Sequence, residues 1–334
     1  MIGHTNVNTR NTAYRVGTLT VDAVDTATYL PSDYGLDYFD RVDTTLSVDN
    51  PFYEICVGHN ITFSAADVGT EPLEIPAYLF YRQTKLYEIN MPSGITSIGT
   101  YAFYNTGVRI LHLYCPNLTF VGVSAFQSNK MLMRVYINAP NLQSINDMFV
   151  GCEKIYAAYI EAMPSMYTRM FSGIYRIEYC EIGEGVAAMA ENVFYLPPGS
   201  FTAAYNFHIL FFRQKIVDEH GNVVQDVPAM HANAIGDRPV AKTFIHVPLN
   251  SLCAYRVRIS EGSGNARYYD LVAPFVEAEI GDVLPTSLTQ TSDEHVGNYT
   301  LEWYSDYAYN NIMTSNIVSA KGRYFAKVLA GSET

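Results

Sequence analysis

Large apolar side chains recur along the middle of the chain at a nearly constant interval. Six phenylalanines in this part of the chain follow one another at intervals of 22 or 23 residues. They are Phe80, Phe103, Phe126, Phe149, Phe171 and Phe194. A fixed period of about 20–50 residues is typical of repeat proteins, whose units stack because one unit alone cannot bury its apolar face. The pattern therefore predicts a solenoid in which these phenylalanines interdigitate in the core.

Each unit also contains a short run that alternates apolar and polar residues and is followed by a proline. These prolines are Pro92, Pro116, Pro140 and Pro164. Because proline fixes φ and lacks an N–H donor, we expect it to end a strand at the same height in every repeat. Alternation sends successive side chains to opposite faces of a strand. The predicted inward set is Ile89, Met91, Leu113, Cys115, Ile137, Ala139, Ile160, Ala162, Cys180 and Ile182.

The alternate positions face outward and form a ribbon of aromatic, amide and carboxylate side chains. The candidates for partner binding are Glu88, Asn90, His112, Tyr114, Tyr136, Asn138, Tyr159 and Glu161, and Glu181 extends the ribbon less securely. Solenoids present such stacked surfaces to partners, and Tyr with Asn suits adaptable polar contacts. Tyrosine is also enriched in β-strands of all kinds, so the ribbon fits the solvated face of an ordinary sheet equally well. Both interpretations stay open.

The amino-acid sequence around the phenylalanines is similar from unit to unit. The shared residues are Ile98-Gly99 with Ala102-Phe103, Val121-Gly122 with Ala125-Phe126, and Phe149 with Gly151-Cys152. From about Leu73 to Phe194 the chain resembles the BspA-like leucine-rich repeats, whose units read as an apolar strand, a Pro and an IGxxAFxxC-type stretch. The last two units lack the Ile-Gly and Ala-Phe pairs. We expect Gly99 and Gly122 to adopt turn conformations that a Cβ would oppose.

The flanks carry strand signals without the repeat. Near the N-terminus, strand-like runs are separated by turn-prone residues; they are Tyr14–Val24, Tyr38–Val48, Phe52–Val57 and Ile61–Phe63. Residues 216–224 predict a hairpin, and residues 227–241, with two prolines, predict a linker. Six further runs follow: Thr243–Val247, Tyr255–Ser260, Tyr268–Val272, Tyr299–Trp303, Asn311–Ser319 and Arg323–Val328.

The predicted fold is therefore mainly β, with a BspA-like leucine-rich-repeat solenoid between two other β-rich parts. Regular short strands with turn signals favour a β-sandwich or barrel-like module at the C-terminal end. We divide the chain into an N-terminal β-rich module (1–70), the solenoid (71–210), a hairpin and linker (211–241) and a C-terminal β module (242–334).

Charge and hydropathy exclude two classes of partner. The formal net charge is −12, and Lys and Arg are scattered singly, so a nucleic-acid surface is not expected. No apolar run approaches the about 18 residues of a membrane-spanning helix, so membrane insertion is not expected either.

Motifs for catalysis, cofactors and metals are not found. The sequence has no HExxH, Walker loop, GxSxG or strand-linked GxGxxG, and we predict no catalytic residue, no cofactor and no metal site. Its five cysteines contain no CxxC pair and are expected to be reduced core thiols. Cys253 and His246 could approach across a hairpin, but no third group suggests a nucleophile. The aromatic segment Glu302–Tyr309 suits either stacking on sugars or packing in a sheet.

These observations favour a non-enzymatic structural and binding protein. The first hypothesis is a virion component, a phage appendage or a capsid- or tail-associated protein, because the start of the chain lacks the features of a secretory signal. The alternative is a bacterial cell-surface adhesin, which the BspA-like resemblance implies. A third is a glycan-acting enzyme in the C-terminal module with the solenoid as its targeting arm. Expected partners are assembly proteins, a host-surface receptor or a glycan, and a homo-oligomer is an option. The expected location is a virion or extracellular surface, or else the bacterial cell surface.

Overall fold

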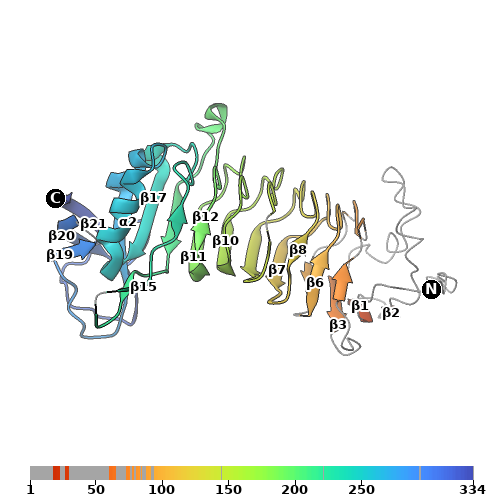
Figure 1. Ribbon diagram of the computed structural model, residues 1–334, viewed down its shortest axis with the longest axis horizontal. Coiled ribbons are helices and arrows are strands. Elements are labelled where there is room, and N and C mark those ends of the chain that lie inside the picture. The colour runs from red at the N-terminus through yellow and green to blue at the C-terminus, as the bar shows by residue number, and fades with distance from the viewer. Residues whose placement is uncertain are drawn as a thin grey trace.

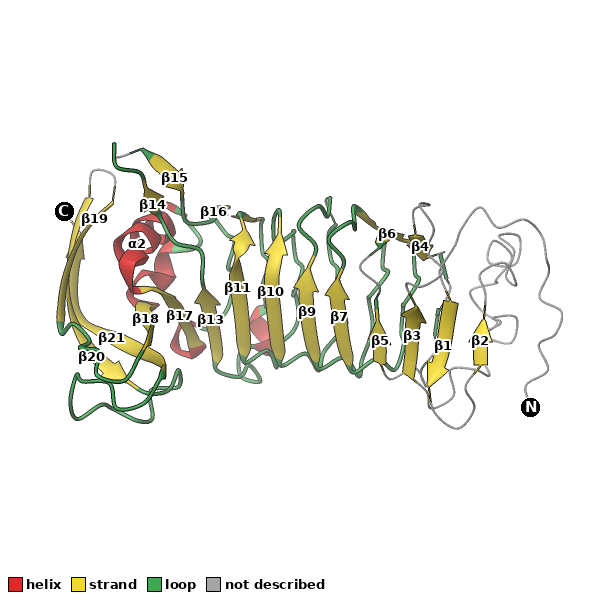
Figure 2. Ribbon diagram, turned by 90° about the horizontal axis from the view of Figure 1, so that it is seen from below, coloured by secondary structure: helices red, strands yellow, loops and turns green. Residues whose placement is uncertain are grey.

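The computed structural model is elongated and mainly β, and one large sheet runs along its length (Figure 1). It describes residues 18–22, 27–29, 60–64, 73–75, 77–78, 80–82, 84, 88–91, 94–143, 145–220, 222–292 and 295–333. Within these residues the sheet contains fourteen strands, which lie side by side in Figure 2.

Parallel strands make up the middle of the large sheet. They are β3 (Asn60–Ser64), β5 (Glu88–Asn90), β7 (Ile110–Tyr114), β9 (Arg134–Asn138), β10 (Ala157–Met163), β11 (Tyr179–Val186), β13 (Phe207–Phe211), β17 (Thr243–Pro248) and β18 (Val272–Ala278). Antiparallel strands continue the sheet at both ends. They are β1 (Thr18–Asp22) and β2 (Ala27–Tyr29) beside β3, and β21 (Gly322–Glu333), β20 (His295–Tyr304) and β19 (Ser287–Ser292) beside β18.

Short elements complete each turn of the chain. A three-stranded sheet joins β4 (Leu73–Ile75), β6 (Ile95–Ile98) and β8 (Phe120–Val121), and smaller pairs join β12 (Ala188–Met189) to β16 (Ala229–Met230) and β14 (Ile216–Val217) to β15 (Val223–Gln225). The helices within the described residues are η4 (Pro198–Ser200), η5 (Val240–Lys242), η6 (Leu249–Ser251), α2 (Leu252–Glu261) and η7 (Ala266–Leu271). The antiparallel β14–β15 pair confirms the hairpin predicted for residues 216–224.

The predicted strand ends and inward faces are confirmed for most of the repeats. Pro116, Pro140 and Pro164 each follow a strand by one or two residues. Inward residues of the predicted set are buried in the core: Met91, Leu113, Cys115, Ile137, Ala139, Ile160, Cys180 and Ile182. The side chain of Ile89 and the residue Pro92 lie outside the described residues.

Ala162 is an exception to the predicted inward set. The pairing of β10 with both neighbours shifts between Ile160 and Ala162, so one extra residue is inserted at Glu161. Such a β-bulge reverses the alternation beyond it. Met163, not Ala162, is therefore the buried residue at the end of β10.

The phenylalanine ladder forms as predicted. All six rings are buried, and neighbouring ring centroids lie between 5.1 and 6.2 Å apart. The ladder ends where the Phe207 ring packs against Phe194 at 5.0 Å and the Arg238 guanidinium lies 4.5 Å from the centroid of the Phe207 ring. Stacking of one unit on the next thus buries what a single unit would leave exposed.

The turns around the ladder have a conformation that the sequence did not reveal. Residues two positions before and two positions after most of the phenylalanines have positive φ, as at Tyr101 (55°) and Asn105 (53°) around Phe103. Most of these residues are not glycine. Gly122 is needed for a different reason from the predicted turn conformation, since a Cβ there would lie 2.3 Å from the backbone nitrogen of Thr100.

The parallel ladder continues beyond the predicted end of the repeats. β11 pairs with β13, β13 with β17 and β17 with β18, all in parallel. Part of the predicted linker forms the next turn of the stack: the backbone N–H groups of Asn192 and Val193 donate to the carbonyls of Asn233 and Ala234.

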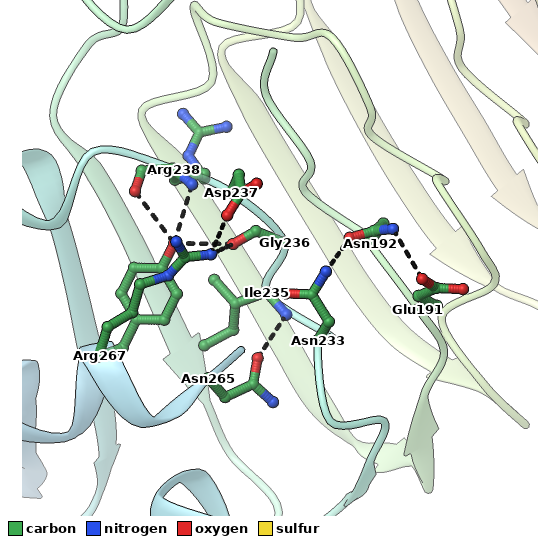
Figure 3. Close-up of polar contacts among 10 residues, drawn as sticks. Glu191, Asn192, Asn233, Ile235, Gly236, Asp237, Arg238, Asn265 and Arg267 are labelled. Atoms are coloured by element: carbon green, nitrogen blue, oxygen red, sulfur yellow. Dashed lines mark hydrogen bonds and ion pairs between the residues drawn. The ribbon is translucent and has the colours of Figure 1, made fainter. Parts of the chain in front are cut away.

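Side chains hold this turn in place on both sides (Figure 3). Asn233 Nδ2 donates to Asn192 Oδ1 at 2.5 Å, and Asn265 Oδ1 accepts from the Ile235 N–H at 3.2 Å. Arg267 donates to the carbonyl of Gly236 at 3.0 Å. Residues 233–238 are therefore packed between the repeats and η7, although the boundaries of the domains stay a prediction.

The C-terminal part differs from the predicted sandwich or barrel, because β18, β21, β20 and β19 continue the large sheet. Three of its six predicted strands are confirmed by β17, β20 and β21. The run Tyr255–Ser260 lies instead in α2, Tyr268–Val272 lies mostly in η7, and Asn311–Ser319 contains only isolated bridges.

The helix α2 was missed because it is buried on nearly all sides. It contacts β17, β18, β19 and β20, so apolar residues surround its axis and no clear 3.6-residue period remains. A distant side chain completes its start, since Gln290 Oε1 in β19 accepts the Cys253 N–H at 3.1 Å.

Near the N-terminus, β3 confirms the strand predicted at Ile61–Phe63, and β1 lies within the run Tyr14–Val24. The runs Tyr38–Val48 and Phe52–Val57 lie outside the described residues.

Candidate binding surface

The outward face of the parallel strands carries a row of stacked rings. The register pairs His112 with Tyr136 and Tyr136 with Tyr159 across β7, β9 and β10. Both pairs of ring centroids are 4.7 Å apart, with planes within 8° of parallel. In parallel strands that pair in register, residues at the same height lie side by side. His112, Tyr136 and Tyr159 contact one another for this reason.

The other predicted candidates lie next to this row. Tyr114 and Asn138 pair one step further along β7 and β9, and the Tyr114 ring lies 6.0 Å from His112. Glu88 and Asn90 belong to β5, where the backbone register pairs them with Ile110 and His112. Glu161 occupies the bulge of β10 and is exposed.

A cleft of about 690 Å³ opens over this face. Four of the predicted residues line it: Tyr114, Tyr136, Tyr159 and Glu161. His112 and Asn138 lie beside the cleft rather than in its lining. The remaining lining residues are Ile160, Ala162, Glu181, Gly183, Glu184, Gly185, Phe212 and Arg323.

The bulge shapes the floor of the cleft. It runs on into β11, where Ile182 and Gly185 pair with Ile160 and Ala162 and two residues intervene. A Cβ on Gly183 would lie 2.3 Å from the carbonyl oxygen of Glu161. Glycine therefore allows the two bulged backbones to approach closely.

The far wall of the cleft comes from the C-terminal strands. Arg323, at the start of β21, donates to Glu181 Oε1 at 2.8 Å and to the Tyr179 hydroxyl at 3.2 Å. It also pairs with Glu277 of β18 at 3.2 Å. Its guanidinium lies 4.9 Å from the Phe212 ring centroid. Residues more than 140 positions apart are thus joined across the cleft.

A second hollow of about 300 Å³ extends the cleft beyond this wall. Glu184 and Phe212 line both spaces. On the far side it is bordered by Phe275 and Glu277 of β18. The binding surface therefore continues from the repeats onto the C-terminal part of the sheet.

Sequence reasoning missed Glu184, Phe212 and Arg323. Glu184 lies in β11, and Phe212 directly follows β13. Both strands continue the parallel ladder of the repeats, so the positions of these two residues had a usable signal. Arg323 had none, since the curl of the sheet that brings it to Glu181 depends on the whole C-terminal part.

Two of the tyrosines that line the cleft, Tyr114 and Tyr159, have a raised pKa. Burial, with help from Glu161 and Tyr136, raises the pKa of Tyr114. Burial, followed by Tyr136 and Glu181, raises the pKa of Tyr159. At neutral pH these hydroxyls can therefore donate and accept hydrogen bonds.

Beyond the cleft the outward face is covered by the chain itself. Tyr307 packs on His208 at 4.8 Å and on Tyr179 at 5.2 Å between ring centroids. The Tyr309 hydroxyl lies 3.3 Å from His246 Nδ1. The aromatic segment 302–309 is thus used in packing, and Trp303 is buried with its Nε1 donating to the Pro285 carbonyl at 2.7 Å.

His246, which the sequence could place near Cys253, contacts another histidine instead. His246 Nε2 lies 3.0 Å from Nδ1 of His208, one strand away, and both rings are buried. Cys115, Cys152, Cys180 and Cys253 are buried thiols in the core, as expected, and Cys56 lies outside the described residues. Burial raises the pKa of Cys115 and Cys152 to about 12, so these thiols are unreactive at neutral pH.

The comparison with protein families identifies the repeats. Residues 73–197 match the BspA type leucine rich repeat region in six copies. This part of the chain is therefore similar to BspA-type leucine-rich repeats, and we call it the BspA-type region. The BspA-type region supplies the floor of the cleft from Tyr114 to Gly185, whereas Phe212 and Arg323 lie beyond it.

One solved structure gives a partial likeness. It is the crystal structure of a leucine rich cell surface protein from Faecalibacterium prausnitzii A2-165, 13% identical, with a TM-score of 0.28, covering 64% of this chain and 59% of that one. The chain thus spans less than two thirds of that protein. A search of curated proteins gives no match.

Two further findings, on metal sites and on membrane-spanning helices, apply to the residues that the structure describes. No group of three His, Cys, Asp or Glu side chains is arranged there to hold a metal ion. No helix in the same part of the chain is long and apolar enough to cross a membrane.

Proposed function

We propose that the protein is a non-catalytic binding protein that contacts a partner through the outward face of its BspA-type repeats. The parallel strands and stacked cores form a solenoid, and the cleft lined by Tyr114, Tyr136 and Tyr159 is the contact site. The observation that carries this proposal is the cleft itself, whose floor is a row of tyrosines held in place by strand register.

Rigidity supports a binding role. Each ring of the row is held by its neighbour, so little side-chain conformational entropy is lost when a partner binds. Tyrosine also contributes large contact area at low entropic cost. The partner is a protein or a glycan exposed at a surface.

Display at an extracellular surface is part of the proposal, on a virion or on a bacterial cell. Antibodies raised against the chain separate the two placements by immunogold labelling. Gold on phage particles from a lysed culture of the source organism supports the virion component. Gold on the cell envelope of intact cells supports the adhesin.

The binding role is tested with a triple variant of the outward row. Labelled full-length chain is incubated with intact bacterial and animal cells, and retention is compared with that of His112→Ala/Tyr136→Ala/Tyr159→Ala. We expect the variant to lose at least about tenfold in retention, because central aromatic residues dominate binding energies.

A matched control removes stacked tyrosines elsewhere. Tyr81, Tyr101 and Tyr104 also contact one another, on the turns that contain the phenylalanines. Their triple alanine variant should bind as the unmodified chain does. Phe126→Ala should instead lower the free energy of unfolding by about 3–5 kcal/mol, whereas the outward variant should change it far less. Equal retention for the two tyrosine variants would refute the proposal.

A further inference from the structure

We propose that the cleft binds a basic segment of the partner, with a lysine or arginine side chain seated against Glu161 and Glu184. This inference rests on the proposed function and names the chemistry of the ligand at the same site. It follows from three features of the cleft: covered ring faces, unpaired carboxylates and a guanidinium already bound there.

Stacked neighbours cover both ring faces of Tyr136 at the centre of the row. Tyr136 lies between His112 and Tyr159, each at 4.7 Å. Tyr159 has Tyr179 on its other side at 6.0 Å. A sugar that stacks on an aromatic face therefore finds both faces of Tyr136 occupied. At Tyr136 a ligand therefore meets only the edge of the ring with its hydroxyl group.

The charge of the lining is negative. Glu161, Glu181 and Glu184 face a single basic residue, Arg323. Arg323 is already paired with Glu181 and Glu277. Glu161 and Glu184 are exposed, and neither is in an ion pair with a basic side chain of the described residues. The net acidic charge of −12 for the whole chain further attracts a cationic segment.

Arg323 shows what the surface can hold. Its guanidinium is bound by a carboxylate, Glu181, by the hydroxyl of Tyr179 and by the Phe212 ring. A carboxylate and a phenol also come together elsewhere in the lining, where Glu161 of β10 is close enough to Tyr114 of β7, two strands away, to raise the pKa of the Tyr114 hydroxyl, after the larger effect of burial. A ligand guanidinium or ammonium at Glu161 would therefore repeat an arrangement that the chain already uses.

The test uses defined peptides and the full-length chain. Dye-labelled tri-arginine amide is titrated and its binding followed by fluorescence anisotropy, with tri-citrulline amide as the neutral analogue of the same shape. We expect tri-arginine to bind at least about tenfold more tightly, and its affinity to fall as salt is raised.

Charge-neutralising variants locate the site. Glu161→Gln/Glu184→Gln should weaken tri-arginine binding about fivefold or more. Glu153→Gln/Glu219→Gln removes the same charge at exposed positions outside the cleft and should stay within about twofold of the unmodified chain. Arg323→Gln frees Glu181 and should tighten tri-arginine binding, provided that its circular dichroism spectrum matches that of the unmodified chain.

Three results would overturn the inference. Equal binding of tri-citrulline, equal losses for the two glutamine pairs, or cleft binding of a neutral oligosaccharide in place of tri-arginine each contradict a basic ligand. If cell retention still depends on the outward row in that case, the proposed function stands and only the ligand chemistry is wrong. If cell retention is also independent of the row, both proposals fail.

Discussion

At the scale of single residues, the outward face contains a pair of buried histidines whose rings are linked by one hydrogen bond. The Tyr309 hydroxyl donates to the Ala326 carbonyl at 3.0 Å, which leaves its oxygen free to accept Nδ1–H of His246. Nε2 of His246 then accepts Nδ1–H of His208 at 3.0 Å. This order of donors requires the His246 ring to be neutral, because a proton on Nε2 of His246 would face the N–H of His208.

The pair makes stability depend on pH in a defined direction. Burial lowers the pKa of His208 to about 4, although Asp306 partly opposes this, and burial with His208 lowers that of His246. Because the unfolded chain binds protons more readily, stability is full above about pH 6.5 and is lost as pH falls towards 4. His208 alone accounts for at most about 3 kcal/mol of this loss.

Denaturant unfolding at a series of pH values between 7 and 4 measures the effect. The unmodified chain should lose stability over this range, and His208→Gln/His246→Gln should show a flatter dependence. An identical slope for the two proteins would contradict the buried pair.

The phenylalanine ladder was predictable residue by residue, since a single period covers all six positions. The histidine pair was not, because an insertion carrying the β14–β15 hairpin separates His208 from His246 and hides the period.

At the scale of elements, the β-bulge shared by β10 and β11 decides which side chains reach the cleft. Strict alternation predicted Ala162 inward; the extra residue at Glu161 turns Ala162 outward and buries Met163. Alternation and proline positions were enough to locate the strands, but the phase shift at the bulge is hidden in the sequence because Ala162 and Met163 are both apolar.

The stability of the bulge depends on glycine at position 183. A Cβ at Gly183 would meet the Glu161 carbonyl oxygen at 2.3 Å, and backbone atoms cannot move aside cheaply. We expect Gly183→Ala to lower the free energy of unfolding by about 1–3 kcal/mol and to weaken binding at the cleft.

The control is Gly199→Ala, where nothing lies within 4 Å of the added carbon. It should change stability by less than about 0.5 kcal/mol. Denaturant melts of the two variants give the comparison, and equal losses would show that the close approach in the bulge is unimportant.

At the scale of the whole molecule, the sheet is continuous from the repeats to the C-terminus and brings distant residues to one cleft. The floor residues Tyr136 and Tyr159 could be predicted from the repeat register. The wall residue Arg323 could not, because the predicted separate sandwich would have placed it in another sheet, and only the observed continuation through β18 and β21 joins it to Glu181.

The central claim is that the cleft over the outward row is where the partner binds. A photoreactive benzoylphenylalanine in place of Tyr136 tests it directly, with Val123, 70% exposed on the turn after β8, as the control position. After irradiation on intact cells or particles that retain the chain, we predict a discrete cross-linked adduct from position 136 and none from position 123. Adducts from position 123 alone would contradict the account and place the contact on the opposite side of the repeats.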